Sequence, residues 1–146
     1  MDQQEPSIEI GDDQDGTLGQ IKVNHTVVAT IVKMAATSVK GVVGVGGSFI
    51  ENVSALFSSK DYDKGVRVSE DEVGNYLIEL RVHMEYGVEL AKTAENLQLT
   101  VGKQVTNMTG KTVAAVDVII EGVKMPEEVA ASRRAAEEEG KSSLSD

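Results

Sequence analysis

The clearest pattern along the chain is an alternation of apolar and polar side chains over residues 76–86, broken only at Leu77. It predicts a strand with one buried face and one charged face that meets solvent, so the sheet is covered on one side only. A second strand begins at Val66 and Val68. These two valines fall on the buried face only if the hairpin loop has an odd number of residues, such as Val73–Asn75. We therefore expect an odd loop.

Apolar side chains at helical spacing follow in two places. They predict a helix over residues 26–40, capped by Asn24, and a second helix over residues 88–108. Gly110 then stands where a left-handed residue usually ends a helix. Residues 113–123 return to alternation, which predicts a last strand with Val116, Val118 and Ile120 facing inward.

The remaining segments are shorter or more polar. Alternation at Ile21 and Val23 predicts a first strand over residues 19–24. The connection over residues 44–65 contains a capping-box spacing, which predicts a short helix at 49–57. Pro126 opens a polar helix over residues 127–139 that frays beyond Gly140.

These elements define one domain over residues 19–125, between a disordered acidic tail (1–18) and a polar helical tail (126–146). Their order is β-α-β-β-α-β. The expected fold is an α+β two-layer sandwich, with a four-stranded, mainly antiparallel sheet and two main helices on one face.

Composition narrows the classes of function. The net charge is −10, and the two tails carry −6 and −3 of it, so the domain itself is nearly neutral. Without a basic excess, nucleic acid and anionic lipid are poor partners. The chain contains no cysteine, which excludes disulfides and thiolate chemistry. It shows neither a signal peptide nor a membrane-spanning run, and a cytoplasmic location is expected.

A glycine-rich stretch, residues 41–48, shares part of its spacing with three ligand-binding motifs. Gly47 stands where a P-loop needs lysine, and Phe49 stands where a dinucleotide fingerprint needs its last glycine. The stretch is therefore interpreted as a helix C-cap and a turn. The spacing of Gly41 and Gly44 also fits the GxxG loop of KH modules, and the split βαβ order is also that of an RRM, but stacking aromatics are missing. An RNA-binding KH- or RRM-like module is kept as an alternative.

The sequence gives little evidence for a catalytic site or a metal site. A zinc site would have to combine His83 with carboxylates such as Glu85, and a charged, solvated sheet face is the simpler interpretation. No nucleophile lies at an interpretable spacing from a base. We expect no enzymatic activity, no metal and no cofactor.

Several stretches together resemble the bacterial alkaline shock, or general envelope-stress-response, proteins. They are GQIKVN at 19–24, VKGVV at 39–43, KGVRV at 64–68, LRVHMEYG at 80–87, VTNMTG at 105–110 and VAAVDVIIEGV at 113–123. Their order and the Tyr-Gly and Met-Thr-Gly anchors carry the resemblance, which covers most of residues 19–123. The glycine-rich connection and both acidic tails depart from it.

The resemblance implies a non-enzymatic cytoplasmic stress-response protein that acts in cell-envelope homeostasis. Its partners would be proteins: a second copy, a separate membrane anchor protein that holds it at the inner face of the cell membrane, or both. No nucleic-acid partner and no direct membrane insertion are expected. Regulation of a lipid-metabolic enzyme is a further alternative.

The expected partner-binding surface is the charged face of the sheet. Mixed charges with one exposed isoleucine suit a polar protein contact; a merely solvated face is the alternative. The residues assigned to this surface are Arg67, Glu79, Arg81, His83, Glu85 and Ile119.

Overall fold

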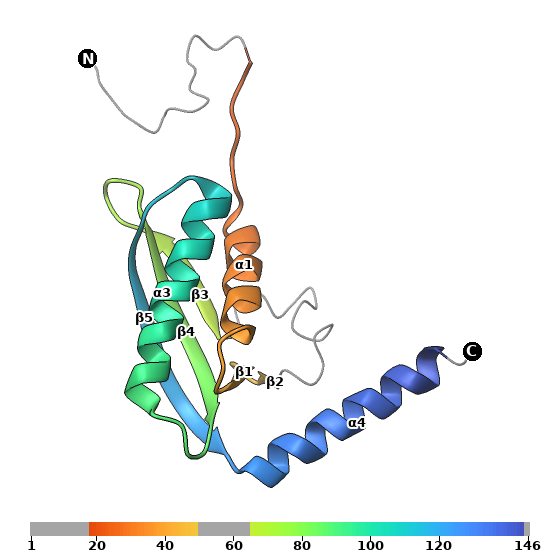
Figure 1. Ribbon diagram of the computed structural model, residues 1–146. Coiled ribbons are helices and arrows are strands. Elements are labelled where there is room, and N and C mark those ends of the chain that lie inside the picture. Colours follow the sequence, from red (N-terminus) through yellow and green to blue (C-terminus); the bar gives the residue numbers. More distant parts are fainter. Residues whose placement is uncertain (1–17, 50–64, 145–146) are drawn as a thin grey trace.

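The computed structural model describes residues 18–49 and 65–144 (Figure 1). Its elements are α1 (His25–Thr37), β1 (Val42–Val45), β2 (Ser48–Phe49), β3 (Val66–Glu70), β4 (Tyr76–Glu85), α3 (Leu90–Thr109), β5 (Val113–Lys124) and α4 (Pro126–Leu144). Within this part of the chain, five strands form a single sheet, and α1 and α3 cross the same face of it. The predicted α+β class is confirmed.

Strand β4 is the centre of the sheet. It pairs antiparallel with β3 and β1 and parallel with β5, whose connection runs through α3. The even-numbered side chains of β4 are buried beneath the helices, and the odd-numbered ones are half-buried on the other face. The sheet is therefore mainly antiparallel and is covered on one side only among the described elements, as the alternation predicts.

Local chemistry fixes the ends of these elements. The Asn24 side chain accepts a hydrogen bond from the Thr26 amide and caps α1, and Gly110 ends α3 with a φ of 78°. The β3–β4 loop spans residues 71–75, and the Asp71 carboxylate accepts hydrogen bonds from three backbone amides in it. The odd loop length is confirmed, with five residues in place of three, so Val66 lies opposite Leu80.

The N-terminal part corrects the predicted element order. Residues 19–24 form no strand and lead away from the sheet (Figure 1). Their alternation places Ile21 in solvent, 82% exposed, because the chain enters α1 directly. Helix α1 also ends at Thr37 rather than at residue 40, because Ser38 already turns the chain.

The glycine-rich stretch contains turns, as predicted, at Gly41 and at residues 46–47, but it does not cap α1 and it also contains a strand that was not predicted. Gly41 adopts a φ of 98°, and the chain then enters β1, all four residues of which are buried. Since β1 is buried on both faces, it shows no alternation that would distinguish it from the preceding helix. The predicted 49–57 helix lies outside the described residues, apart from Phe49, which belongs to β2.

Strands β1 and β3 lie end to end along the same edge of β4. Val45 lies opposite Val82 and Val66 lies opposite Leu80, so only Arg81 separates the two pairings. The Gly46 amide donates to the Arg81 carbonyl, and the Arg81 amide donates to the Gly65 carbonyl, both at 2.8 Å. The neighbour of β4 on this side is thus interrupted between residues 46 and 65.

The C-terminal helix is longer than predicted, since α4 continues through Gly140 to Leu144. It begins at Pro126, where the missing N–H costs nothing, and the Glu128 carboxylate accepts a hydrogen bond from the Met125 amide. Figure 1 shows α4 pointing away from the sheet.

Candidate interaction surface

The face of the sheet opposite α1 and α3, here called the open face, brings all six sequence-predicted residues together. Arg67 comes from β3, and Ile119 comes from β5. The other four lie at alternate positions of β4: Glu79, Arg81, His83 and Glu85. They share this face because residues two apart along a strand point to the same side.

Cross-strand register arranges these side chains in rows. Arg67, Glu79 and Asp117 form one row across three strands, and Arg81 lies opposite Ile119 in the next. The Arg81 Nε atom is 3.9 Å from the Glu121 Oε2 atom, with both side chains about one-third exposed. The open face therefore displays both signs of charge, with Ile119 43% exposed among them.

His83 is half-buried and lies between two glycines, opposite Gly44 of β1 and Gly122 of β5. A Cβ atom placed on Gly122 would be 2.9 Å from the His83 Cδ2 atom. The imidazole therefore occupies the space over the Gly122 backbone. Sequence reasoning missed this role of Gly122, although a glycine inside a strand often marks a close approach.

Lys22, which the predicted first strand would have placed on the same face, is exposed outside the sheet. The surface is therefore formed by β3, β4 and β5. Its half-buried charged side chains can form ion pairs and hydrogen bonds with a polar protein surface, and Ile119 offers an apolar contact.

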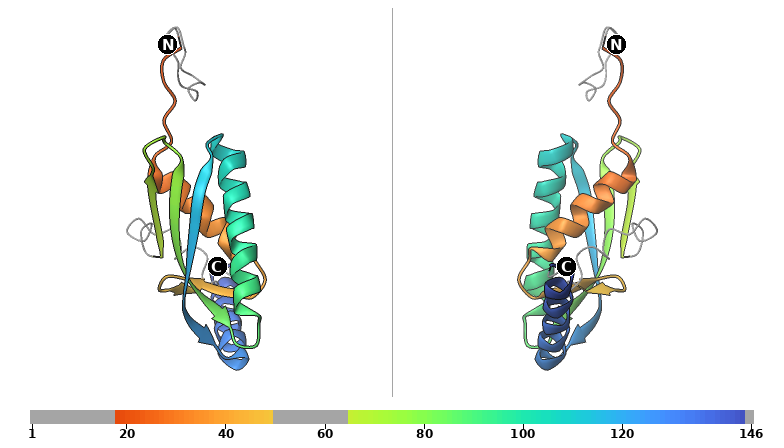
Figure 2. Two further views of the ribbon diagram at one scale, coloured as in Figure 1. Left: turned by 90° about the vertical axis from the view of Figure 1, so that its left-hand side faces the viewer. Right: turned by 90° about the vertical axis from the view of Figure 1, so that its right-hand side faces the viewer.

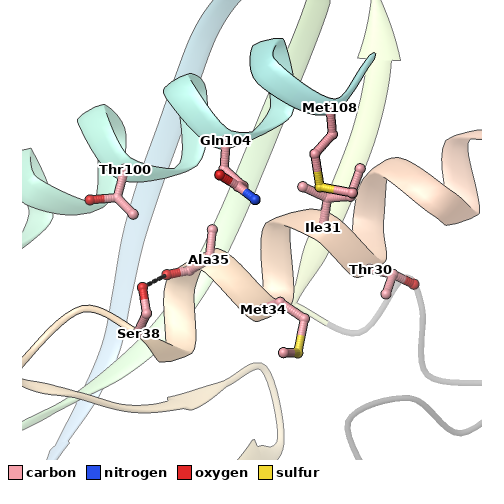
Figure 3. Close-up of a pocket in the computed structure, with 8 residues that line it drawn as sticks. All are labelled: Thr30, Ile31, Met34, Ala35, Ser38, Thr100, Gln104 and Met108. Carbon is pink, nitrogen blue, oxygen red and sulfur yellow. Dashed lines mark hydrogen bonds between the residues drawn. The ribbon is translucent and has the colours of Figure 1, made fainter.

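A second feature, not predicted from the sequence, is an apolar groove of about 420 Å³ between α1 and α3 (Figure 3). In Figure 3, Gln104 and Met108 of α3 point toward α1. Met34 and Met108 at this groove are 51% and 63% exposed. A signal was present in the sequence, since Thr100, Gln104 and Met108 recur at four-residue spacing beside the buried stripe of α3.

A polar cluster ties the start of α1 to the β3–β4 hairpin and the α3–β5 loop. The Glu70 carboxylate lies 2.9 Å from His25 Nε2 and 3.3 Å from Lys111 Nζ. The Lys111 ammonium also lies 4.4 Å from the centre of the Tyr76 ring. The hydrogen bond from His25, and then Lys111, hold the pKa of Glu70 below its usual value although burial opposes them.

Tyr76 is almost completely buried beneath this cluster, and its burial, followed by the charge of Glu70, raises the pKa of its phenol. The charged groups of the cluster are paired with one another: Glu70 contacts both His25 and Lys111, and Lys111 lies over the Tyr76 ring. The cluster therefore links four elements at one end of the sheet, which is a structural role.

The described residues contain no group of three or more His, Asp or Glu side chains placed to hold a metal ion. None of the described helices combines the length and apolar character that a membrane span requires.

A family model matches residues 13–125, which include every strand and both main helices of the domain. It is the model of the alkaline shock protein 23 family, described as having a cell envelope-related function. The chain belongs to this family. The resemblance inferred from the sequence is confirmed.

Relatives of this alkaline shock family member include an uncharacterized protein of Streptococcus pyogenes serotype M6, 30% identical over 73% of this chain and 89% of that protein. The uncharacterized proteins YqhY and YloU of Bacillus subtilis are 27% and 24% identical. They align with 77% and 73% of this chain, and with 83% and 90% of their own lengths. No solved structure matches the chain significantly.

Proposed function

We propose that this family member acts in cell-envelope homeostasis as a non-enzymatic cytoplasmic stress-response protein, through protein–protein contacts made by the open face. Its partner is a protein: a second copy, a membrane anchor protein that holds it at the inner face of the membrane, or both. The family function is cell envelope-related. The observation that carries the proposal is the open face itself, which β3, β4 and β5 form and which α1 and α3 leave uncovered.

Three properties of the open face support a protein partner. Acidic and basic side chains both lie in cross-strand rows on this face, and a complementary surface can match their arrangement in register. The side chains of β4 on this face are half-buried, so less of their conformational freedom remains to be lost on binding. Ile119 adds an apolar contact near Arg81.

The same surface is a poor one for RNA. The half-buried odd-numbered positions of β4 carry no Phe, Tyr or Trp ring on which a base could stack. The Gly41–Gly44 spacing of a KH loop falls at the start of β1, where Val42 and Val43 are buried in the sheet instead of forming an exposed loop. The Gly41–Gly44 spacing therefore no longer supports a KH module, and an RRM-like surface still lacks its usual stacking rings.

The test is a double variant, Arg81→Glu with Ile119→Lys, in the full chain. A matched control, Lys103→Glu with Leu99→Lys, makes the same changes of charge at exposed positions of α3. Thermal melts confirm that each variant is folded. Cross-linking in cells, followed by separate analysis of membrane and soluble fractions, measures complex formation.

We expect the open-face variant to lose most of its cross-linked complexes and its membrane-fraction signal, while the control variant keeps both. A folded open-face variant with normal complexes and normal distribution would refute the proposal. A strong, salt-dependent affinity in an RNA filter-binding assay would favour the RNA-binding alternative instead.

A further inference from the structure

We propose that the outer edge of β5 binds an extended segment of a partner protein in which apolar residues alternate with Lys or Arg. The inference deepens the proposed function and rests on it, because it specifies the chemistry of one partner segment. The partner strand would lie beside β5 and continue the sheet.

The outer edge of β5 has no strand beside it in the described part of the chain. β5 pairs with β4 along one side, and α3 packs on its inner face. The left panel of Figure 2 looks onto this edge, and no described element lies in front of it. An unpaired edge presents main-chain donors and acceptors to a partner, and strand addition is an established mode of peptide recognition.

The part of this edge suited to regular pairing is short. The register between β4 and β5 shifts between Val113 and Ala115 and again between Ile120 and Gly122. Bulges of this kind twist an edge away from indiscriminate pairing. Ala115–Ile120 is left as the stretch of regular register, which matches a short segment better than a long strand.

The side chains along Ala115–Ile120 define what such a segment should carry. Val116 is 8% exposed, and Val118 and Ile120 are half-buried against the core on the helix side. Asp117 and Ile119 are exposed on the open face. Because opposite residues in a sheet share a face, the segment needs apolar residues at every second position.

The charges on the open face determine which residues the partner segment should carry at its remaining, alternate positions. Asp117 lies opposite Glu79, and like charges directly opposite each other destabilise a strand pair. Arg67 lies on the far side of Glu79, and among the described residues Asp117 makes no ion pair. A Lys or Arg on the incoming strand, opposite Asp117, would supply the missing positive charge.

A second copy of β5 does not meet this requirement. Antiparallel pairing centred on Val118 places Ile119 of the second copy opposite Asp117, which adds no cation. Pairing centred on Asp117 or on Ile119 places an acidic residue, Asp117 or Glu121, opposite Asp117. The charges therefore favour a different chain at this edge.

The experiment uses the full protein and a dye-labelled peptide, Thr-Val-Lys-Val-Lys-Val-Thr, with blocked termini. Fluorescence anisotropy measures binding, and hydrogen exchange locates it. One control peptide has Glu in place of Lys. A second has alternate backbone nitrogens methylated on the edge that would pair, which removes the hydrogen bonds of strand addition.

We expect the Lys peptide to bind and to slow amide exchange within residues 115–120, and both control peptides to bind more weakly. Asp117→Lys should weaken the Lys peptide by about fivefold, because one attractive cross-strand pair becomes repulsive. Glu95→Lys makes the same charge change on exposed α3 and should leave the affinity unchanged.

Absence of binding up to millimolar peptide, equal binding of the methylated peptide, or unchanged exchange at residues 115–120 would each overturn the edge site. Equal affinity of the Asp117→Lys and Glu95→Lys proteins would also overturn it. None of these results bears on the Arg81→Glu, Ile119→Lys experiment, so failure at the edge and failure of the open face are distinguishable.

Discussion

Leu97 is fully buried at the middle of α3, where the helix faces the sheet. We expect Leu97→Ala to lower the free energy of unfolding by about 2–5 kcal/mol, through the lost burial and the cavity that remains. Leu99, 69% exposed on the same helix, provides the control: Leu99→Ala should change it by less than about 0.5 kcal/mol. Urea melts of both variants measure the difference, and equal midpoints would contradict the packing of α3.

Glu70 makes stability depend on pH. Its pKa is lowered in the folded state, first by the hydrogen bond from His25 and then by Lys111. A lowered pKa means that the ionised group stabilises the fold above its unfolded pKa, and that this contribution is lost as the pH falls through the folded value. Glu70→Gln should therefore lower the melting temperature at neutral pH and flatten its decline in acid.

Melts from neutral pH to below pH 4 measure this effect, with Glu72→Gln in the adjacent exposed loop as the control. If wild type and Glu70→Gln lose stability in parallel over this range, the cluster around Glu70 does not contribute to the acid response.

At the scale of elements, the sequence pattern identified the helices and strands that have one buried face and one face toward solvent. The alternation of β4 and the parity of its loop to β3 were predictable because only one face is buried, and Gly110 was a direct sign of the end of α3. β1 was not predictable, because Val42 and Val43 are both buried and follow the valines of α1 without a change of pattern. Nor could alternation alone show that residues 19–24 lie outside the sheet.

The same difference between buried and exposed faces decides how much of the candidate site could be predicted from the sequence. All six open-face residues were placed correctly on one face, because their positions on β3, β4 and β5 follow from two-residue periodicity. The position of the His83 ring over Gly122 depends on a register shift in β5 at Glu121, and this shift has no distinct signal in the sequence. The groove between α1 and α3 depends on how the two helices pack.

Helix α4 should be separable from the domain, because it points away from the sheet and its acidic first turn is capped locally. We expect deletion of residues 126–146 to change the free energy of unfolding by less than about 0.5 kcal/mol. Denaturant melts of the shortened and full chains measure this difference in the free energy of unfolding, and Leu97→Ala serves as a reference for a large decrease. A large loss of stability would show that α4 packs on the domain.

At the scale of the whole molecule, β1 and β3 lie end to end beside β4, and a deletion can test this arrangement. Gly46 and Gly65 both bond to Arg81, and a Cβ atom on Gly65 would lie 2.5 Å from the Gly46 nitrogen. Removing residues 46–64, which include β2, would join Val45 to Gly65 opposite Arg81 and leave β1 and β3 in register with β4. We expect this shortened chain to unfold cooperatively, and a loss of cooperativity in its melt would contradict the register.

The meeting of Gly46 and Gly65 also makes this point a natural place for the chain to vary in length. The two ends already lie side by side, so doubling the segment between them costs only about 0.6 kcal/mol of closure entropy. Insertions there would leave the core, the open face and the β5 edge untouched. A reporter domain or a pair of new chain termini could be introduced at the same place while β4 keeps both halves of its neighbour.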